Sequence, residues 1–77
     1  MMPFKSAEAA RAYVVGLKIE GPSFELPIAD GLTFADLRDD IGAGMAFVVD
    51  AILAQGYGPD GFEQRQGFRL YRYVPLD

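Results

Sequence analysis

Three carboxylates lie close together in the middle of the chain, at Asp36, Asp39 and Asp40. On a helix, Asp36 and Asp40 share one face at i and i+4, with Asp39 beside them. Their oxygens could hold a divalent cation, and a buried pair could act as acid and base. Acidic side chains are common on solvated helix faces, and nothing in the surrounding sequence predicts burial. We therefore predict that this group faces solvent or a partner, and we assign no metal ligand.

The chain lacks the residue types on which most side-chain catalysis depends. It contains no His and no Cys, and only Ser6, Ser23 and Thr33 carry aliphatic hydroxyls. A Ser-His-Asp or Cys-His arrangement cannot be built from this set. The glycine pairs also lack the Lys and the spacing of a phosphate-binding loop. We predict a protein that is not an enzyme, with no catalytic residue and no cofactor.

Arginines alternate with aromatic residues between Arg65 and Tyr73. Such a pattern can stack nucleic-acid bases and contact phosphates. No separate basic patch accompanies it, so we interpret it as packing of arginine stems over tyrosine rings. Direct binding of nucleic acid is therefore not expected. As a strand, this segment places Phe68, Leu70, Arg72 and Val74 on one face and Arg69, Tyr71 and Tyr73 on the other.

Two aromatic residues, Tyr57 and Phe62, flank a glycine-rich segment that reads as an exposed turn. Aromatic side chains are enriched at protein interfaces, and on loops they equally often cover a small core. We predict that both are exposed anchors for a partner.

Negative charge is concentrated in the middle of the sequence, although the net charge is only −4. The stretch from Glu20 to Glu63 contains nine acidic residues and one basic residue, Arg38, so its net charge is −8. Such a block repels phosphates and attracts basic protein surfaces; its simpler role is to keep a small domain soluble. The partner-binding residues predicted on this ground are Glu20, Glu25, Asp30, Asp36, Asp39 and Asp40.

Alternating apolar residues predict an N-terminal β-hairpin after a short helix that begins at Ser6. The alternation runs through Val15, Leu17 and Ile19, stops at the turn 21–23, and resumes at Phe24. The interval 9–19 could instead be helical throughout.

The middle of the chain predicts two helices and its end predicts strands. Thr33 would begin the first helix, the glycines of 42–44 would break it, and the second helix would span 45–55 with Gly56 as its cap. The segment 68–74 reads as a strand that pairs with 62–64 across a turn at 66–67. The fold class is therefore α+β, a small antiparallel sheet (N-terminal hairpin plus C-terminal strand or hairpin) packed against one or two helices.

The segment from Leu32 to Leu53 resembles a helix-turn-helix, with Gly42 at the turn, and the following residues could form the wing of a winged helix. That resemblance implies a DNA-binding regulator. The residues at its recognition positions cannot donate paired hydrogen bonds to a base. A winged-helix variant of this sequence would therefore bind protein. The recognition positions are occupied by Ala43, Gly44, Met45, Ala46, Phe47, Val49 and Asp50.

The sequence as a whole indicates a single domain, 1–77, that binds a protein partner with a basic surface. Small phage-encoded inhibitors that imitate DNA, including anti-CRISPR proteins, have this size and charge. A winged-helix regulator of transcription and an accessory subunit of an enzyme complex are the alternatives. No apolar run is long enough to span a membrane, and a cytoplasmic location is expected. The apolar 45–53 helix would be buried by a homodimer, a partner groove or the sheet.

Overall fold

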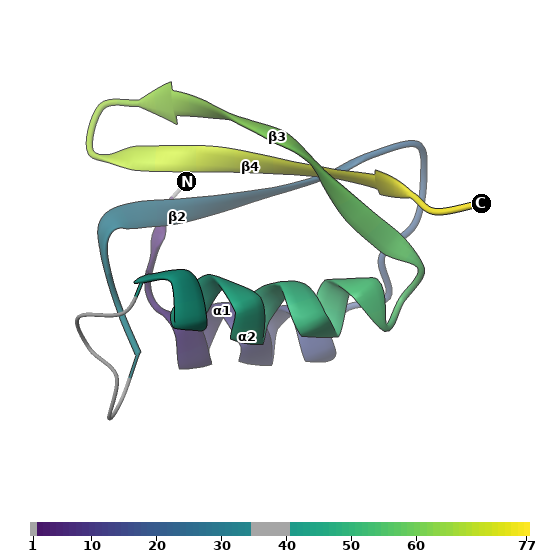
Figure 1. The fold of residues 1–77 in the computed structure, drawn as a ribbon, viewed down its shortest axis with the longest axis horizontal. Coiled ribbons are helices and arrows are strands. Elements are labelled where there is room, and N and C mark those ends of the chain that lie inside the picture. Colours follow the sequence, from purple (N-terminus) through teal and green to yellow (C-terminus); the bar gives the residue numbers. More distant parts are fainter. Residues whose placement is uncertain (1, 35–40) are drawn as a thin grey trace.

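A four-stranded sheet and two helices form two layers, with both helices on one face of the sheet (Figure 1). The structure, a computed structural model, describes residues 2–34 and 41–77. It confirms the α+β class predicted from the sequence. In chain order the elements are β1 (Phe4–Ser6), α1 (Ala7–Val15), β2 (Phe24–Thr33), α2 (Ile41–Leu53), β3 (Tyr57–Arg65) and β4 (Phe68–Pro75).

The sheet is mixed, with the strand order β1-β2-β4-β3. The short strand β1 runs parallel to β2, and β4 lies between β2 and β3, antiparallel to both. The C-terminal hairpin is confirmed, because Arg65 pairs with Phe68 across the two-residue turn at 66–67. The N-terminal hairpin is wrong: β2 has β1 and β4 as its neighbours, and the segment 16–23 contains no strand.

Helix α1 includes the first residues that looked like a strand. Ser6 caps it, since its hydroxyl accepts a hydrogen bond from the Ala9 N–H at 3.1 Å. Ala7, Ala10 and Val14 are fully buried, which is the helical period, whereas Val15 remains 65% exposed. The apparent alternation at 15–19 therefore joins a helix end to a loop.

The loop after α1 is tied to the end of α2 by Gln55. Its Oε1 accepts from the Ile19 N–H at 2.8 Å, and its Nε2 donates to the carbonyls of Val14 at 3.0 Å and Leu17 at 2.9 Å. The Val14 carbonyl, in the last turn of α1, also accepts from the Leu17 N–H at 3.1 Å, so Gln55 adds a second donor to it. Tyr57 adds a bond from its hydroxyl to the Gly21 carbonyl at 2.6 Å. These contacts position a loop that has no strand neighbour.

Helix α2 begins earlier than predicted. It includes the glycines of 42–44, which were expected to separate it from a preceding helix. Gly44 lies where helix and sheet approach closely: a Cβ there would come within 3.3 Å of the Leu32 and Phe34 side chains and 3.5 Å of the Ala7 Cβ. The glycine is therefore a packing residue within the helix. The helix ends at Leu53, two residues before the predicted end at 55; Gly56 has the left-handed φ of 83° expected of a cap and donates its N–H to the Leu53 carbonyl at 2.9 Å.

The first helix of the predicted helix-turn-helix does not begin at Thr33, because Leu32 and Thr33 belong to β2. Leu32 is buried in the core. Most of that predicted helix, residues 35–40, lies outside the described residues. The strand at its start removes the basis for the winged-helix reading.

The core lies between the sheet and the helices. Leu26 and Tyr73 on the sheet and Val14, Val48 and Ile52 on the helices are its largest fully buried side chains. The Tyr73 hydroxyl is buried there without a hydrogen-bond partner among the described residues. Because α1 and α2 both pack on this face, the opposite face of the sheet is left free of helices (Figure 1).

Candidate functional site

The helix-free face of the sheet carries a shallow hollow bordered by three carboxylates. Glu25 on β2 and Asp60 and Glu63 on β3 lie around Leu70 and Arg72 of β4. The register explains the grouping, since Glu25 pairs with Arg72 and Glu63 pairs with Leu70 across neighbouring strands. Residues directly opposite each other project from the same face. We call this group the sheet-face hollow; Phe62 also contributes to its lining.

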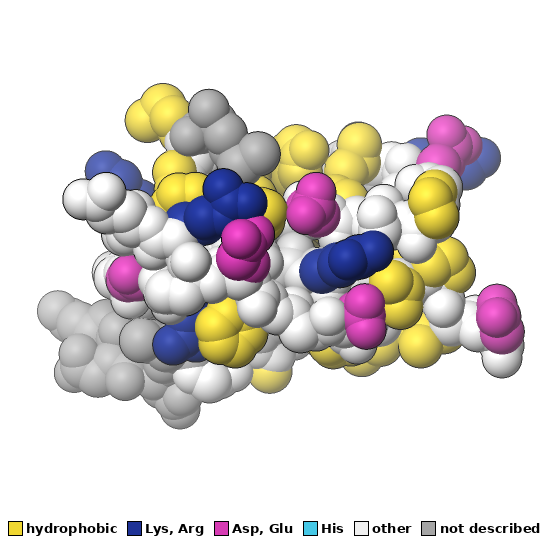
Figure 2. Space-filling model, turned by 90° about the horizontal axis from the view of Figure 1, so that it is seen from above, with side chains coloured by type: hydrophobic (Ala, Val, Ile, Leu, Met, Phe, Trp, Pro, Cys, Tyr) yellow, Lys and Arg dark blue, Asp and Glu magenta, His cyan; other side chains and the backbone are white. Residues whose placement is uncertain are grey.

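Acidic and basic side chains alternate across this face (Figure 2). Arg72 lies 3.8 Å from Asp60, and Arg65 lies 2.7 Å from Glu63. Glu25 forms no ion pair with another described residue. Exposed pairs of this kind contribute only about 0–1 kcal/mol to stability. Their carboxylates can therefore exchange an intramolecular partner for a Lys or Arg of another protein at little cost.

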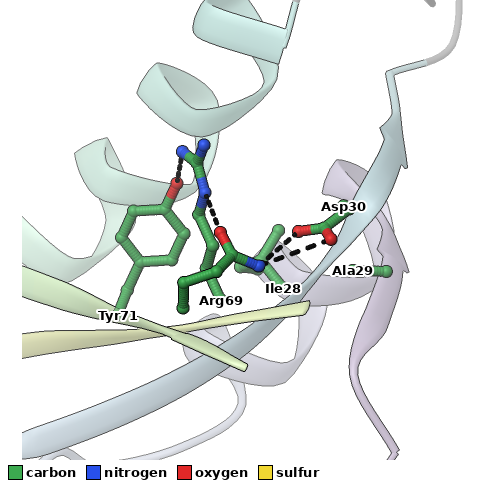
Figure 3. Close-up of a pocket in the computed structure, with 6 residues that line it drawn as sticks. Ile28, Ala29, Asp30, Arg69 and Tyr71 are labelled. Atoms are coloured by element: carbon green, nitrogen blue, oxygen red, sulfur yellow. Dashed lines mark hydrogen bonds between the residues drawn. The ribbon is translucent and has the colours of Figure 1, made fainter. Parts of the chain in front are cut away.

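A second hollow lies at the end of the sheet, on the face that carries the helices. Arg69 and Tyr71 of β4, Gln64 of β3 and Asp30 of β2 line it (Figure 3). The Arg69 Nε donates to Gln64 Oε1 at 3.0 Å and its Nη1 donates to the Tyr71 hydroxyl at 3.3 Å. The Gln64 Nε2 in turn donates to the Asp30 carboxylate at 3.2 Å.

The Arg69 guanidinium is held in place on this surface. Its Cζ lies 4.6 Å from the centroid of the Phe62 ring, and that ring lies 5.4 Å from the ring of Tyr71. The hydrogen bond with Tyr71 raises the pKa of Arg69 further above its ordinary value. The guanidinium is thus a fixed positive charge over an aromatic pair. The prediction was of arginine stems over tyrosine rings; here the guanidinium of Arg69 lies over Phe62 and bonds to the hydroxyl of Tyr71.

Comparison with family models, curated proteins and solved structures finds no match for this chain.

The two aromatic residues predicted as exposed anchors have different environments. Phe62 is 53% exposed, as predicted; it lines the sheet-face hollow, and its ring contacts Arg69 of the second hollow. Tyr57 is only 8% exposed, so the prediction of an exposed side chain is wrong. Its segment is the start of β3 and not a turn, and the bond to the Gly21 carbonyl directs the ring inward.

The predicted acidic residues do not gather on one surface. Glu25 lies at the sheet-face hollow, Asp30 lies at the second hollow, and Glu20 lies in the loop before β2, 3.6 Å from Lys18. The predicted partner-binding residues Asp36, Asp39 and Asp40 lie outside the described residues. Within residues 2–34 and 41–77, no three acidic side chains are close enough together to hold a metal ion.

Sequence reasoning missed the grouping of Glu25, Asp60 and Arg72. The signal was present in the hairpin turn at 66–67, which fixes the pairing of β3 with β4. Placing β2 beside β4 required tertiary information, because Glu25 and its cross-strand neighbour Arg72 are 47 positions apart in the sequence.

Proposed function

We propose that this chain is a non-enzymatic binding module that docks on a basic surface of a protein partner through the sheet-face hollow. The observation that carries the proposal is the position of Glu25 and Asp60 on either side of Arg72, on the face without helices. A Lys or Arg from the partner would bind Glu25, which forms no ion pair with another described residue, and would compete with Arg72 for Asp60.

The apolar residues of the hollow would supply the rest of the contact. Leu70 is half-buried in the hollow. Phe62 also lines it, with its ring packed against Arg69 and Tyr71 at the edge of the sheet. Burial of aromatic and aliphatic side chains supplies most of the affinity at protein interfaces, whereas charges mainly set the association rate and the choice of partner. An inhibitor or regulator of a nucleic-acid-binding protein is the form of this function that suits a chain with net charge −4.

The test is capture of a partner from the native host, followed by kinetics with the purified pair. The double variant Glu25→Gln/Asp60→Asn should slow association by roughly tenfold at low salt and flatten its salt dependence. The matched control is Asp50→Asn/Asp77→Asn. It also removes two negative charges, but neither residue lines the sheet-face hollow, and Asp50 lies on α2 in the helix layer.

Equal association rates for the two variants would contradict the sheet-face hollow as the docking site. An electrophoretic mobility shift with generic duplex DNA belongs to the same test, since the proposal expects no shift at low salt. A clear, salt-dependent shift would favour the DNA-binding alternative instead.

None of the described helices is long and apolar enough to cross a membrane.

A further inference from the structure

Strand β3 forms one edge of the sheet, and no described strand lies beyond it (Figure 1). The two-residue turn makes Arg65 and Phe68 a hydrogen-bonded pair, so that their N–H and C=O groups point at each other. Because this direction alternates along a strand, the backbone groups of Phe62 and Gln64 point away from β4. Two donors and two acceptors therefore line the outer edge of the sheet.

The two halves of β3 differ in how well they are protected against pairing with a strand of another molecule. Pro59 lacks an N–H, and the register is irregular between Pro59 and Phe62, where Gly61 has φ of 89°. Proline and bulges both prevent edge-to-edge pairing. The segment 62–65 contains neither device and pairs regularly with β4. An edge that can accept another strand is thus limited to this second half.

We propose that two copies of this chain pair through this edge, antiparallel, about a two-fold axis at Gln64. The Gln64 residues of the two copies would exchange both backbone hydrogen bonds, and Phe62 of each copy would lie beside the turn residue Gln66 of the other. Both sheets would then join into one, with the two helix-free faces side by side.

Charge on the helix-free face selects this register. With the axis at Gln64, Glu63 of one copy lies directly opposite Arg65 of the other, twice. With the axis at Glu63, two glutamates would face each other, and with the axis at Arg65, two arginines would. Opposite charges across a strand pair stabilise it and like charges destabilise it. The sequence Glu63-Gln64-Arg65 is therefore complementary to itself only about its central residue.

Both charged side chains are accessible to a second copy. Arg65 already lies 2.7 Å from Glu63 of its own chain, and both side chains are about half exposed. In the pair each arginine would lie between two glutamates. The contact is short, and interfaces this small form weak dimers. The inference does not depend on the proposed function, because it needs neither a basic partner nor the residues Glu25 and Asp60.

Disulfide trapping tests the register directly, since the chain has no Cys of its own. In the proposed pair, the two Cα atoms at position 64 lie about 5.5 Å apart, within the range that a disulfide spans. The matched control is Phe62→Cys on the same exposed strand, where the two copies of the residue would lie about 14 Å apart. Under mild oxidation, Gln64→Cys should form covalent dimers roughly tenfold faster than Phe62→Cys.

Equal rates for the two variants would overturn the proposal, and so would faster trapping of a Phe62→Cys and Gln64→Cys mixture, which reports the register centred on Glu63. A charge exchange in the Gln64→Cys background is the second measurement. Glu63→Arg alone and Arg65→Glu alone should each slow trapping, because like charges would face each other. The double variant Glu63→Arg/Arg65→Glu should restore it, and a double variant that traps as slowly as the single ones would contradict the pairing.

Discussion

Tyr73 shows how much a single polar atom can cost inside this small core. The side chain is 1% exposed, its ring lies 6.2 Å from that of Phe24, and its hydroxyl has no hydrogen-bond partner among the described residues. Burial, with a smaller contribution from Tyr71, raises the pKa of Tyr73 to about 12 from the ordinary 10.0. The folded state therefore holds this proton more tightly than the unfolded state does.

The consequence is a loss of stability at alkaline pH. A group whose pKa is raised by folding stabilises the fold fully below its unfolded pKa, here 10.0, and loses that contribution as pH rises toward about 12. The free energy of unfolding should therefore fall between these values. In Tyr73→Phe the fall should be smaller, as measured by urea denaturation at stepped pH. Tyr13→Phe is the control, since Tyr13 is 47% exposed; an equal change in both variants would contradict the assignment.

At the scale of elements, the loop between α1 and β2 is held by a single side chain, Gln55, which lies just after the end of α2. Gln55 satisfies one N–H and two carbonyls of the segment 14–19. Half-buried backbone groups of this kind cost about 1–3 kcal/mol each when they lose their partner without gaining water. The loop therefore depends on the end of α2 for its conformation.

Replacement of Gln55 by Ala should lower the free energy of unfolding by about 1–3 kcal/mol. Gln55→Glu should recover part of this loss at most, because a carboxylate accepts from Ile19 but cannot donate to the two carbonyls. Gln66→Ala, in the exposed turn, should change stability by less than about 0.5 kcal/mol. Chemical denaturation of the three variants measures all of these values. A Gln55→Ala variant as stable as the Gln66→Ala control would show that the three bonds are not needed.

The elements that the sequence predicts well are those whose signals are local. The cap at Ser6, the glycine after α2 and the hairpin turn at 66–67 each act within a few residues. The elements predicted wrongly depend on distant partners. Gly44 lies inside a helix where Leu32 and Phe34 leave little room for a side chain, and β2 pairs with β1 instead of with the segment after α1. The same distinction holds at the sheet-face hollow, which joins strands far apart in the chain.

On the scale of the whole molecule, the acidic block of the sequence is divided among several surfaces. Arg11 on α1 lies 3.8 Å from Asp50 on α2, Arg72 lies 3.8 Å from Asp60, and Arg65 lies 2.7 Å from Glu63. Basic residues from both ends of the sequence thus oppose acids of the middle stretch. The described surface is therefore less one-sided than the sequence alone suggests.

The three aspartates of the segment 35–40 are the remaining concentration of charge in the sequence. Changing Asp36, Asp39 and Asp40 together to Asn takes the net charge from −4 to −1. If long-range attraction guides docking, association with the captured partner should slow and lose salt dependence. Stopped-flow or surface binding at two salt concentrations measures this effect. An unchanged association rate would show that these residues only keep the chain soluble.

The central position of β4 sets the order in which this fold can be completed. Residues 68–75 supply the strand between β2 and β3, so both of these strands lack that neighbour until β4 is in place. During synthesis, β2 can pair only with the three residues of β1 until β4 leaves the ribosome. Local hairpin closure is fast, whereas pairing over long sequence distances is slow. We therefore expect β3 and β4 to form first, with the docking of β2 onto that hairpin as the slow step of folding.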